Sequence, residues 1–225
     1  NWDDKKSVDV FFEITKRIID IVASTILLVV FSPVMLVTSI IIKLSSAGPV
    51  LVEKSNTHLM RLGKDGKLFR LYKFRSMIVN SDNLITKDPK YKKLYVEWKN
   101  TNYKLVKDPR VTKIGKFIRK YSIDETPQLF NVLKGEMSLV GPRPYHADEL
   151  AEQQVKYPGT EKFIKEMHKV KPGITGYWQV GGRSSVNFDK RIEMDAYYAR
   201  KKSILFDFLI LLKTPWAMIS GRDAV

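Results

Sequence analysis

The longest apolar stretch in the chain lies near its N-terminus. From Ile21 to Ile42, 22 consecutive positions carry no charged residue. A helix needs roughly 20 apolar residues to cross the hydrocarbon core of a bilayer. The run is too long for a signal peptide, and no small-residue cleavage site follows it. The pattern therefore predicts a membrane helix.

Two features of this run argue against a simple span. Ser32-Pro33 lies near its middle, where a proline removes the hydrogen bond to the Val29 carbonyl and bends the helix. Basic residues also flank both ends, Lys16-Arg17 before and Lys43 after, whereas a spanning helix carries its positive bias on one side. A helix that enters, breaks at Ser32-Pro33 and returns to the same face satisfies both features. The pattern alone leaves the spanning helix and the re-entrant hairpin open.

The next apolar positions alternate with polar ones. Gly48-Pro49 predicts a turn before a short strand, and residues 68–77 predict a longer strand with Lys73 and Arg75 on one face. Two cations at this spacing can grip a diphosphate, or they can form a solvated face.

Helical periodicity dominates the rest of the chain. Residues 80–110 read as an inserted polar segment containing a helix with aromatic residues beside lysines. A basic amphipathic helix begins at Thr112, a polar helix fills 145–170, and a charged helix covers Asp189–Lys202. The apolar tail, 204–219, is short for a span and predicts an interfacial helix anchored by a tryptophan.

The segment from Ser122 to Pro144 carries the candidate chemistry. With Asp124 as N-cap, Pro127 falls in the first turn of a helix, where it is tolerated, and Asp124-Glu125 lie at the positive end of the dipole. On one interpretation these carboxylates only cap the helix. On the other, a phosphate docks there and one carboxylate attacks it. The local pattern does not decide between them.

Charge and composition narrow the partners. Lys and Arg total 39 against 24 Asp and Glu, a net charge of +15, which indicates an anionic partner such as a bilayer or a phosphorylated substrate. No nucleic-acid module is recognisable, so we expect no nucleic-acid partner. The chain has no cysteine, and its three histidines lack metal-ligand spacing, so we expect no histidine-based metal site.

The motifs and their order resemble one family, the bacterial sugar transferases that are monotopic phosphoglycosyl transferases. The motifs that carry the resemblance are Lys16-Arg17, Ser32-Pro33, Gly48-Pro49-Val50, Lys73-Phe74-Arg75-Ser76-Met77, Asp108-Pro109-Arg110-Val111-Thr112, Asp124-Glu125, Pro127-Gln128-Leu129-Phe130-Asn131-Val132, Gly141-Pro142-Arg143-Pro144 and Lys171-Pro172-Gly173.

The resemblance implies an α/β fold with mostly helices. A re-entrant membrane helix-break-helix, a small sheet and amphipathic interfacial helices would surround a cytoplasmic catalytic core. The hairpin with its lead-in would cover 1–47. The catalytic domain would cover 48–225, with the insertion 80–110 and the C-terminal interfacial helix 204–219.

The resemblance also implies a reaction. A sugar-1-phosphate passes from a nucleotide-diphosphate sugar, usually a UDP-sugar, to polyprenyl phosphate at the cytoplasmic face of the bacterial inner membrane, starting a surface glycan such as an exopolysaccharide, capsule or lipopolysaccharide. Carried over, Asp124 is the nucleophile that becomes a phosphoaspartate, Glu125 is its dyad partner, and Mg²⁺ is the cofactor.

Neutralising an anion that attacks another anion is the main physical need of this reaction. Asp124 is the predicted Mg²⁺ ligand. The predicted substrate-binding cations are Lys73, Arg75, Arg119, Arg143 and Arg183. The competing hypotheses are a non-catalytic module that binds anionic membranes, and the same transfer by single displacement. The sequence leaves open the sugar, the polyprenyl length, whether the chain forms a homo-oligomer, and whether an N-terminal region precedes Asn1.

Overall fold

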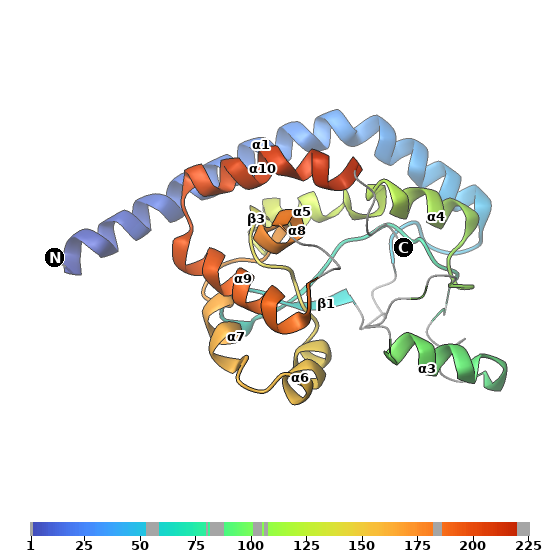
Figure 1. Cartoon of the computed structure of the whole chain (residues 1–225). Coiled ribbons are helices and arrows are strands. Elements are labelled where there is room, and N and C mark those ends of the chain that lie inside the picture. Colours follow the sequence, from blue (N-terminus) through green and yellow to red (C-terminus); the bar gives the residue numbers. More distant parts are fainter. Residues whose placement is uncertain are drawn as a thin grey trace.

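The computed structural model describes residues 2–52, 59–79, 88–100, 108–181 and 186–219, together with residues 81 and 105. The described part is mostly helical, with two small sheets (Figure 1). The helices are α1 (Trp2–Ser45), α3 (Lys92–Asn100), α4 (Lys113–Lys120), α5 (Gln128–Lys134), α6 (Ala147–Lys156), α7 (Glu161–Met167), α8 (Tyr177–Gly181), α9 (Phe188–Lys201) and α10 (Ile204–Ile219). The strands are β1 (Met60–Leu62), β2 (Leu68–Arg70), β3 (Ser138–Val140) and β4 (Gly173–Thr175), and the 3₁₀ turns are η2 (Lys64–Gly66), η3 (Pro89–Tyr91) and η4 (Ile123–Glu125).

Helix α1 contains the whole apolar run and bends near its middle (Figure 1). Pro33 lies inside it and cannot donate to the Val29 carbonyl. The Ser32 hydroxyl donates to that carbonyl at 2.8 Å, so the polar group that proline frees is satisfied within the helix. The chain stays helical through Ser32 and Pro33, and the break predicted there is instead a bend.

Both arms of α1 attach to the same body. In the first arm, Arg17 donates to the Val132 and Leu133 carbonyls of α5 at 2.6 and 2.7 Å. Asp20 accepts from Ser138 Oγ and Leu139 N of β3, both at 3.0 Å. The second arm is joined through a separate apolar cluster that contains Ile42, Phe74 and Ile118. Thus α1 lies along one face of the protein (Figure 1).

The sheets are smaller than the alternation predicts. Strands β1 and β2 form an antiparallel hairpin, with Arg61 opposite Phe69, and β3 pairs with β4 in parallel. After Arg70 the chain remains extended, but it makes only isolated bridges at Phe74 and Met77 among the described residues. The predicted strand over 68–77 is therefore wrong beyond Arg70, because residues 71–77 run between several elements and have no continuous partner strand.

The helix predictions fared better. Helix α4 begins directly after Thr112, close to the predicted start, and Thr112 caps it by accepting from Gly115 N at 2.9 Å; α9 and α10 match their predicted ranges within a residue. The predicted helix over 145–170 is wrong in one respect. It is divided into α6 and α7 because Pro158-Gly159 interrupts it, with Gly159 at φ +89°.

The core lies beneath α1 and α10. It is formed mainly by β3, α5, α9 and α10, with fully buried Val132, Met137 and Tyr198. A second cluster packs α6 and α7 against α9. These two clusters fix the loop that joins β3 to α6, which carries Gly141-Pro142-Arg143-Pro144.

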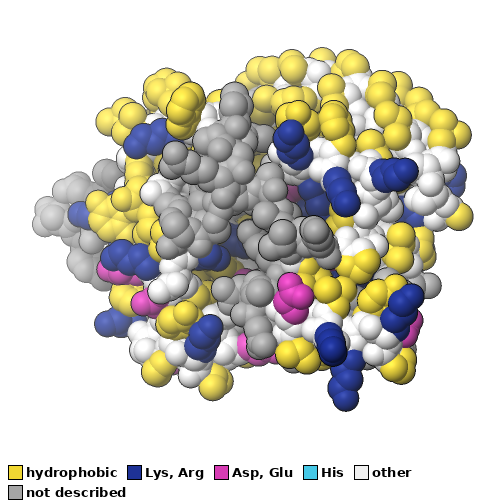
Figure 2. Space-filling view, turned by 45° about the vertical axis from the view of Figure 1, so that its right-hand side comes forward, with side chains coloured by type: hydrophobic (Ala, Val, Ile, Leu, Met, Phe, Trp, Pro, Cys, Tyr) yellow, Lys and Arg dark blue, Asp and Glu magenta, His cyan; other side chains and the backbone are white. Residues whose placement is uncertain are grey.

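A large apolar surface remains exposed on the outer side of α1, α4 and α10. Val29 is 69% exposed, Leu36 63% and Trp216 77%. Figure 2 shows hydrophobic side chains over this side of the molecule, with basic side chains along its lower edge. Residues Asp9–Ser45 of α1 are long and apolar enough to cross a membrane. A patch of this extent marks a membrane or protein contact rather than a surface in water.

Arg75 joins the second arm of α1 to the body. Its Nη2 donates to the Ser46 carbonyl at 2.9 Å, and its Nη1 donates to the Ala47 carbonyl. The side chain is buried, so replacing it by Ala leaves two carbonyls without a partner, and we expect a loss of about 2 kcal/mol in the free energy of unfolding. Chemical denaturation of Arg75→Ala beside Arg200→Ala, which removes an exposed arginine of α9, measures the difference. Equal stability of the two variants would contradict this role.

Candidate active site

The carboxylate pair lies in a tight turn ahead of α5. Ser122 adopts a left-handed conformation (φ 53°, ψ 23°), and Ile123–Glu125 form the 3₁₀ turn η4. Helix α5 begins only at Gln128, with Pro127 as the residue before it. The prediction that Asp124 caps this helix is therefore wrong, because the left-handed Ser122 and Pro127 hold the intervening residues in a separate turn.

The extended segment after β2 brings a lysine onto this turn. Phe74 N donates to the Asp124 carbonyl at 2.9 Å, which fixes the two segments side by side. Lys73 Nζ then lies 3.0 Å from Asp124 Oδ2 and 3.4 Å from Glu125 Oε1. One ammonium group thus bridges both carboxylates of the pair.

The three groups lie at different depths. The side chain of Asp124 is 3% exposed, that of Lys73 25% and that of Glu125 43%. Asp124 is therefore covered, whereas Lys73 and Glu125 beside it are partly exposed.

Electrostatics separates the two carboxylates. Burial raises the pKa of Asp124 above its usual value, although Lys73 opposes the rise. Burial acts on Glu125 in the same direction, but the charges of Lys73 and Arg143 outweigh it and leave the pKa of Glu125 below its usual value. Burial lowers the pKa of Lys73, but the two carboxylates outweigh that effect and raise it. A buried carboxylate with a bound cation is suited to chemistry that needs its charge.

The charges of two predicted arginines also act on the pair. Arg119 of α4 donates from Nε to Ser76 Oγ at 2.9 Å, and its charge interacts with Asp124. Arg143 is exposed, and its charge interacts with Glu125. The structure thus gathers three of the five predicted substrate-binding cations around Asp124 and Glu125: Lys73, Arg119 and Arg143.

The other two predicted cations have different outcomes. Arg75 follows Lys73 by two residues, but its guanidinium holds the end of α1, so the two side chains do not form the predicted common grip. Arg183 lies outside the described residues, and its role stays a prediction.

Asp124 is the predicted ligand of Mg²⁺, and its surroundings show whether an oxygen atom is available for the ion. Among the described residues, no group of three or more His, Cys, Asp or Glu side chains forms a metal cluster. Asp124 Oδ2 is buried and makes no hydrogen bond in the described part of the chain, although it lies close to Lys73. This donor set fits a cation such as Mg²⁺, which prefers oxygen and takes its remaining ligands from phosphate and water.

The aromatic residues that follow Lys171-Pro172-Gly173 pack against neighbouring helices. Trp178 is 6% exposed, and Tyr177 packs against Tyr197 and Phe206, with ring centres 5.7 and 5.2 Å apart. Trp178 and Tyr177 thus contribute to the packing of α8 against α9 and α10.

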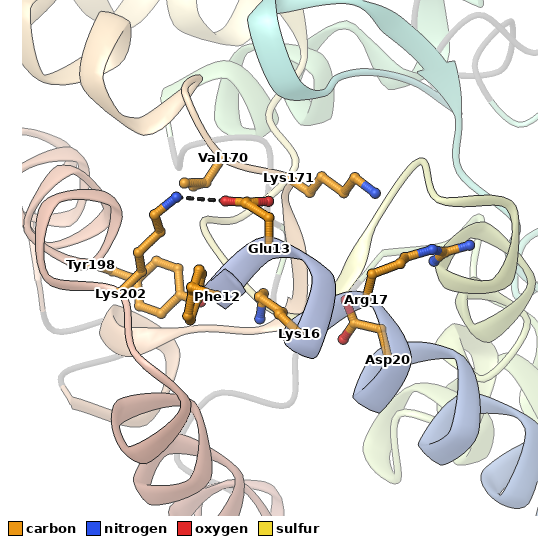
Figure 3. Close-up of a pocket in the computed structure, with 9 residues that line it drawn as sticks. All are labelled: Phe12, Glu13, Lys16, Arg17, Asp20, Val170, Lys171, Tyr198 and Lys202. Atoms are coloured by element: carbon orange, nitrogen blue, oxygen red, sulfur yellow. Dashed lines mark hydrogen bonds and ion pairs between the residues drawn. The ribbon is translucent and has the colours of Figure 1, made fainter. Parts of the chain in front are cut away.

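A surface pocket lies away from the pair, between the first arm of α1, α9 and the segment before β4 (Figure 3). Lys202 donates to Glu13 across it at 2.5 Å, and Lys16 pairs with Asp207 of α10. These ion pairs join α1 to the C-terminal helices. The pocket contains neither carboxylate of the pair.

The structure gives roles to residues for which the sequence analysis predicted none. Asn131 of α5 is fully buried, accepts from Tyr72 N at 2.9 Å and donates to the Arg70 carbonyl at 2.6 Å, so it holds the segment that carries Lys73. Asp195 of α9 accepts from Arg143 N and Tyr145 Oη at 3.4 and 3.3 Å, which anchors the loop that carries Arg143. A polar residue amid the apolar run of α5 was the available signal for Asn131.

Comparison with known proteins identifies the family of the chain. The model of the family described as "Bacterial sugar transferase" matches residues 11–221. The chain belongs to the bacterial sugar transferase family. The family assignment made from the motifs is thus confirmed.

Individual relatives of this bacterial sugar transferase are similar over most of its length. It is 42% identical over 206 residues to the undecaprenyl-phosphate galactose phosphotransferase of Salmonella typhimurium, covering 88% of this chain and 39% of that protein. It is 40% identical over 205 residues to the UDP-glucose:undecaprenyl-phosphate glucose-1-phosphate transferase of Escherichia coli K12, covering 88% of this chain and 39% of that protein. The exopolysaccharide production protein ExoY of Sinorhizobium fredii is 37% identical over 212 residues, which cover 94% of this chain and 88% of ExoY. The chain spans about two fifths of the length of the first two relatives.

Proposed function

We propose that this bacterial sugar transferase moves a sugar-1-phosphate from a UDP-sugar to undecaprenyl phosphate and releases UMP. The arrangement of Lys73 over Asp124 and Glu125 is the observation that carries the proposal, because it supplies a buried anionic nucleophile with cations around it. The printed names of the Salmonella and Escherichia relatives support the donor and acceptor classes.

The reaction would proceed in two displacements. An Asp124 carboxylate oxygen attacks the phosphorus attached to the sugar, and the bond from that phosphorus to the UMP oxygen breaks. An oxygen of undecaprenyl phosphate then attacks the same phosphorus, and the bond to Asp124 breaks, which restores the carboxylate. Each displacement brings together two anions, so Lys73, Arg119 and Arg143 would reduce the repulsion.

Asp124, and Glu125 beside it, would hold Mg²⁺. A bound Mg²⁺ would supply positive charge to the phosphate oxygens. Lys73 would keep Asp124 ionised in spite of its burial, and Arg119 would oppose the same penalty from the α4 side.

A further part of the proposal is that α1 enters the cytoplasmic leaflet and returns to the same side. A spanning helix places its two ends about 30 Å apart across the hydrocarbon core. Here Arg17 and Asp20 in the first arm, and Ile42 in the second, all pack on the same body. The bend at Ser32-Pro33 and the exposed apolar face of α10 also suit a protein embedded in one leaflet.

A donor screen tests the proposed reaction. The full chain is incubated with undecaprenyl phosphate, Mg²⁺ and UDP-glucose, UDP-galactose, UDP-N-acetylglucosamine or UDP-N-acetylgalactosamine, and UMP is measured. We expect UMP release with at least one donor and dependence on the lipid for turnover. Membrane association without UMP release from any donor would favour the alternative of a non-catalytic binding module.

Labelling of introduced thiols tests the membrane arrangement. The chain contains no cysteine, so Asp9→Cys and Leu44→Cys each provide a single thiol, at the exposed start and end of the membrane helix. In intact spheroplasts we expect neither thiol to react with a membrane-impermeant maleimide, and both to react after permeabilisation. Reaction of one of the two in intact spheroplasts would show a spanning helix instead.

A further inference from the structure

The β1–β2 hairpin places a further arginine beside the loop that carries Arg143. Leu62 N donates to the Tyr145 carbonyl at 3.0 Å, so β1 runs against the Gly141–Tyr145 loop. The adjacent Arg61 extends to the next residue of that loop, with its Nη1 2.7 Å from His146 Nδ1. The strand therefore brings Arg61 to the neighbourhood of Arg143 from a separate part of the chain.

The contact with His146 defines how Arg61 is held. A guanidinium group can only donate hydrogen bonds, so His146 Nδ1 accepts, and the imidazole carries its proton on Nε2. The same nitrogen also donates to the Met60 carbonyl at 3.3 Å, so the side chain is held against both its own strand and the loop. His146 thus acts as a positioning residue for the guanidinium.

The charges around Arg61 favour an anion. Burial, and then the charge of Arg143, lower the pKa of Arg61 to about 9, while Glu149 and Glu125 act in the opposite direction. At neutral pH the group is still a cation, but its charge is less well stabilised than in water. Arg143 is an exposed residue, and the carboxylates of Glu149 and Glu125 stabilise its charge. An anion beside Arg61 would offset the cost of burying its charge.

We infer that Arg61 and Arg143 together bind the diphosphate of the nucleotide-sugar donor, with His146 positioning Arg61. A diphosphate presents two adjacent anionic groups, and arginines bind phosphate oxygens with paired, directed hydrogen bonds. The charges of both arginines act on Glu125, the partner of Asp124, so a diphosphate held there lies beside the nucleophile. The inference rests on the proposed function and extends it, since Arg61 is not among the cations predicted from the sequence.

Binding of inorganic pyrophosphate tests directly whether Arg61 contributes to a diphosphate site. Isothermal titration is performed on the full chain in detergent micelles, with Arg61→Gln compared with Lys67→Gln, which removes a charge from the exposed turn of the same hairpin. We expect Arg61→Gln to weaken pyrophosphate binding at least tenfold and Lys67→Gln to change it less than twofold. Equal affinity in the two variants overturns the inference. If Arg61→Gln lowers the melting temperature, Arg61→Lys, which keeps the charge but loses the paired geometry, is used, and an affinity equal to that of the parent overturns the inference.

Steady-state kinetics separates this inference from the proposed reaction. We expect Arg61→Gln to raise the KM for the UDP-sugar about tenfold and to leave the KM for undecaprenyl phosphate within twofold. An unchanged KM for the UDP-sugar in Arg61→Gln counts against donor binding by Arg61 and Arg143. If the parent chain released no UMP, the proposed reaction would fail, whereas a loss of pyrophosphate binding in Arg61→Gln would still support the anion site.

The role of His146 has its own readout. His146→Ala removes the acceptor, and we expect it to raise the donor KM several-fold while kcat changes less. His146→Asn places an amide oxygen near the position of Nδ1, and we expect it to restore most of the affinity. If His146→Ala and His146→Asn had the same KM for the donor, the positioning role of His146 would be contradicted.

Discussion

Replacing Asp124 by Asn is expected to reduce UMP release at least about 10³-fold, because an amide oxygen cannot form a stable phosphoryl intermediate. The structure gives a specific reason to expect so large an effect. Asp124 is almost fully buried, yet it is bridged by Lys73, and the charge of Arg119 acts on it from α4. These cations would then surround a neutral group, and the attacking atom itself would be missing.

The same variant separates catalysis from membrane binding. The apolar surfaces of α1 and α10 do not involve Asp124, so Asp124→Asn should sediment with membranes as the parent does. Asp148→Asn, in the exposed first turn of α6, is the matched control and should retain full activity. Asp124→Ala guards against slow deamidation of the asparagine. Activity in both Asp124 variants within tenfold of the parent would exclude this residue as the nucleophile.

Mass spectrometry of the parent distinguishes two displacements from one. With the UDP-sugar and Mg²⁺ but without lipid, the peptide that contains Asp124 should gain the mass of a phosphosugar, and the Asp124→Asn peptide should not. Full turnover without such an adduct would favour single displacement.

The sequence predicted that several of these side chains lie close together, because its motifs pair residues of fixed chemistry. The Asp124-Glu125 pair, Lys73 and Arg143 are all brought together as the motifs indicated, although Asp124 lies in a 3₁₀ turn rather than at a helix start. The start of a helix also depends on neighbours such as Pro127. A proline is tolerated at several positions near a helix start, so the pattern does not fix which residue is the cap. The proximity of these side chains was thus easier to predict than the backbone conformation that holds them.

The residues that hold the site were harder to predict, since their partners are distant in sequence. Arg17 was read as a membrane-flanking cation, but it binds the end of α5, about 115 residues away. Arg75 and Lys73 share a motif and diverge, because one meets the end of α1 and the other meets η4. Periodicity records which face of an element is apolar. Periodicity does not indicate which backbone carbonyl accepts a hydrogen bond from a buried arginine.

Lys73→Met is expected to lower kcat/KM for the UDP-sugar about 10²-fold at neutral pH and to change the pH dependence as well. Burial already raises the pKa of Asp124, and Lys73 is the main group that opposes the rise. Because the ionised carboxylate attacks, activity falls as the pH decreases through the pKa of Asp124. Without Lys73 that pKa rises further, so the acidic limb of the pH profile should move to higher pH by about 1 unit or more.

The direction of this shift tests the role of Lys73 more sharply than the loss of rate. If Lys73 served only to bind the donor, its removal would raise the donor KM and leave the acidic limb of kcat in place. Lys67→Met, in the exposed turn before β2, controls for the loss of one charge and should preserve both the rate and the profile. A shift of the limb to lower pH would contradict the assignment, because it would mean that Lys73 does not stabilise the charged form of Asp124. A shift to higher pH with a fall in kcat would connect the distance of 3.0 Å between Lys73 Nζ and Asp124 Oδ2 to the ionisation on which the proposed attack depends.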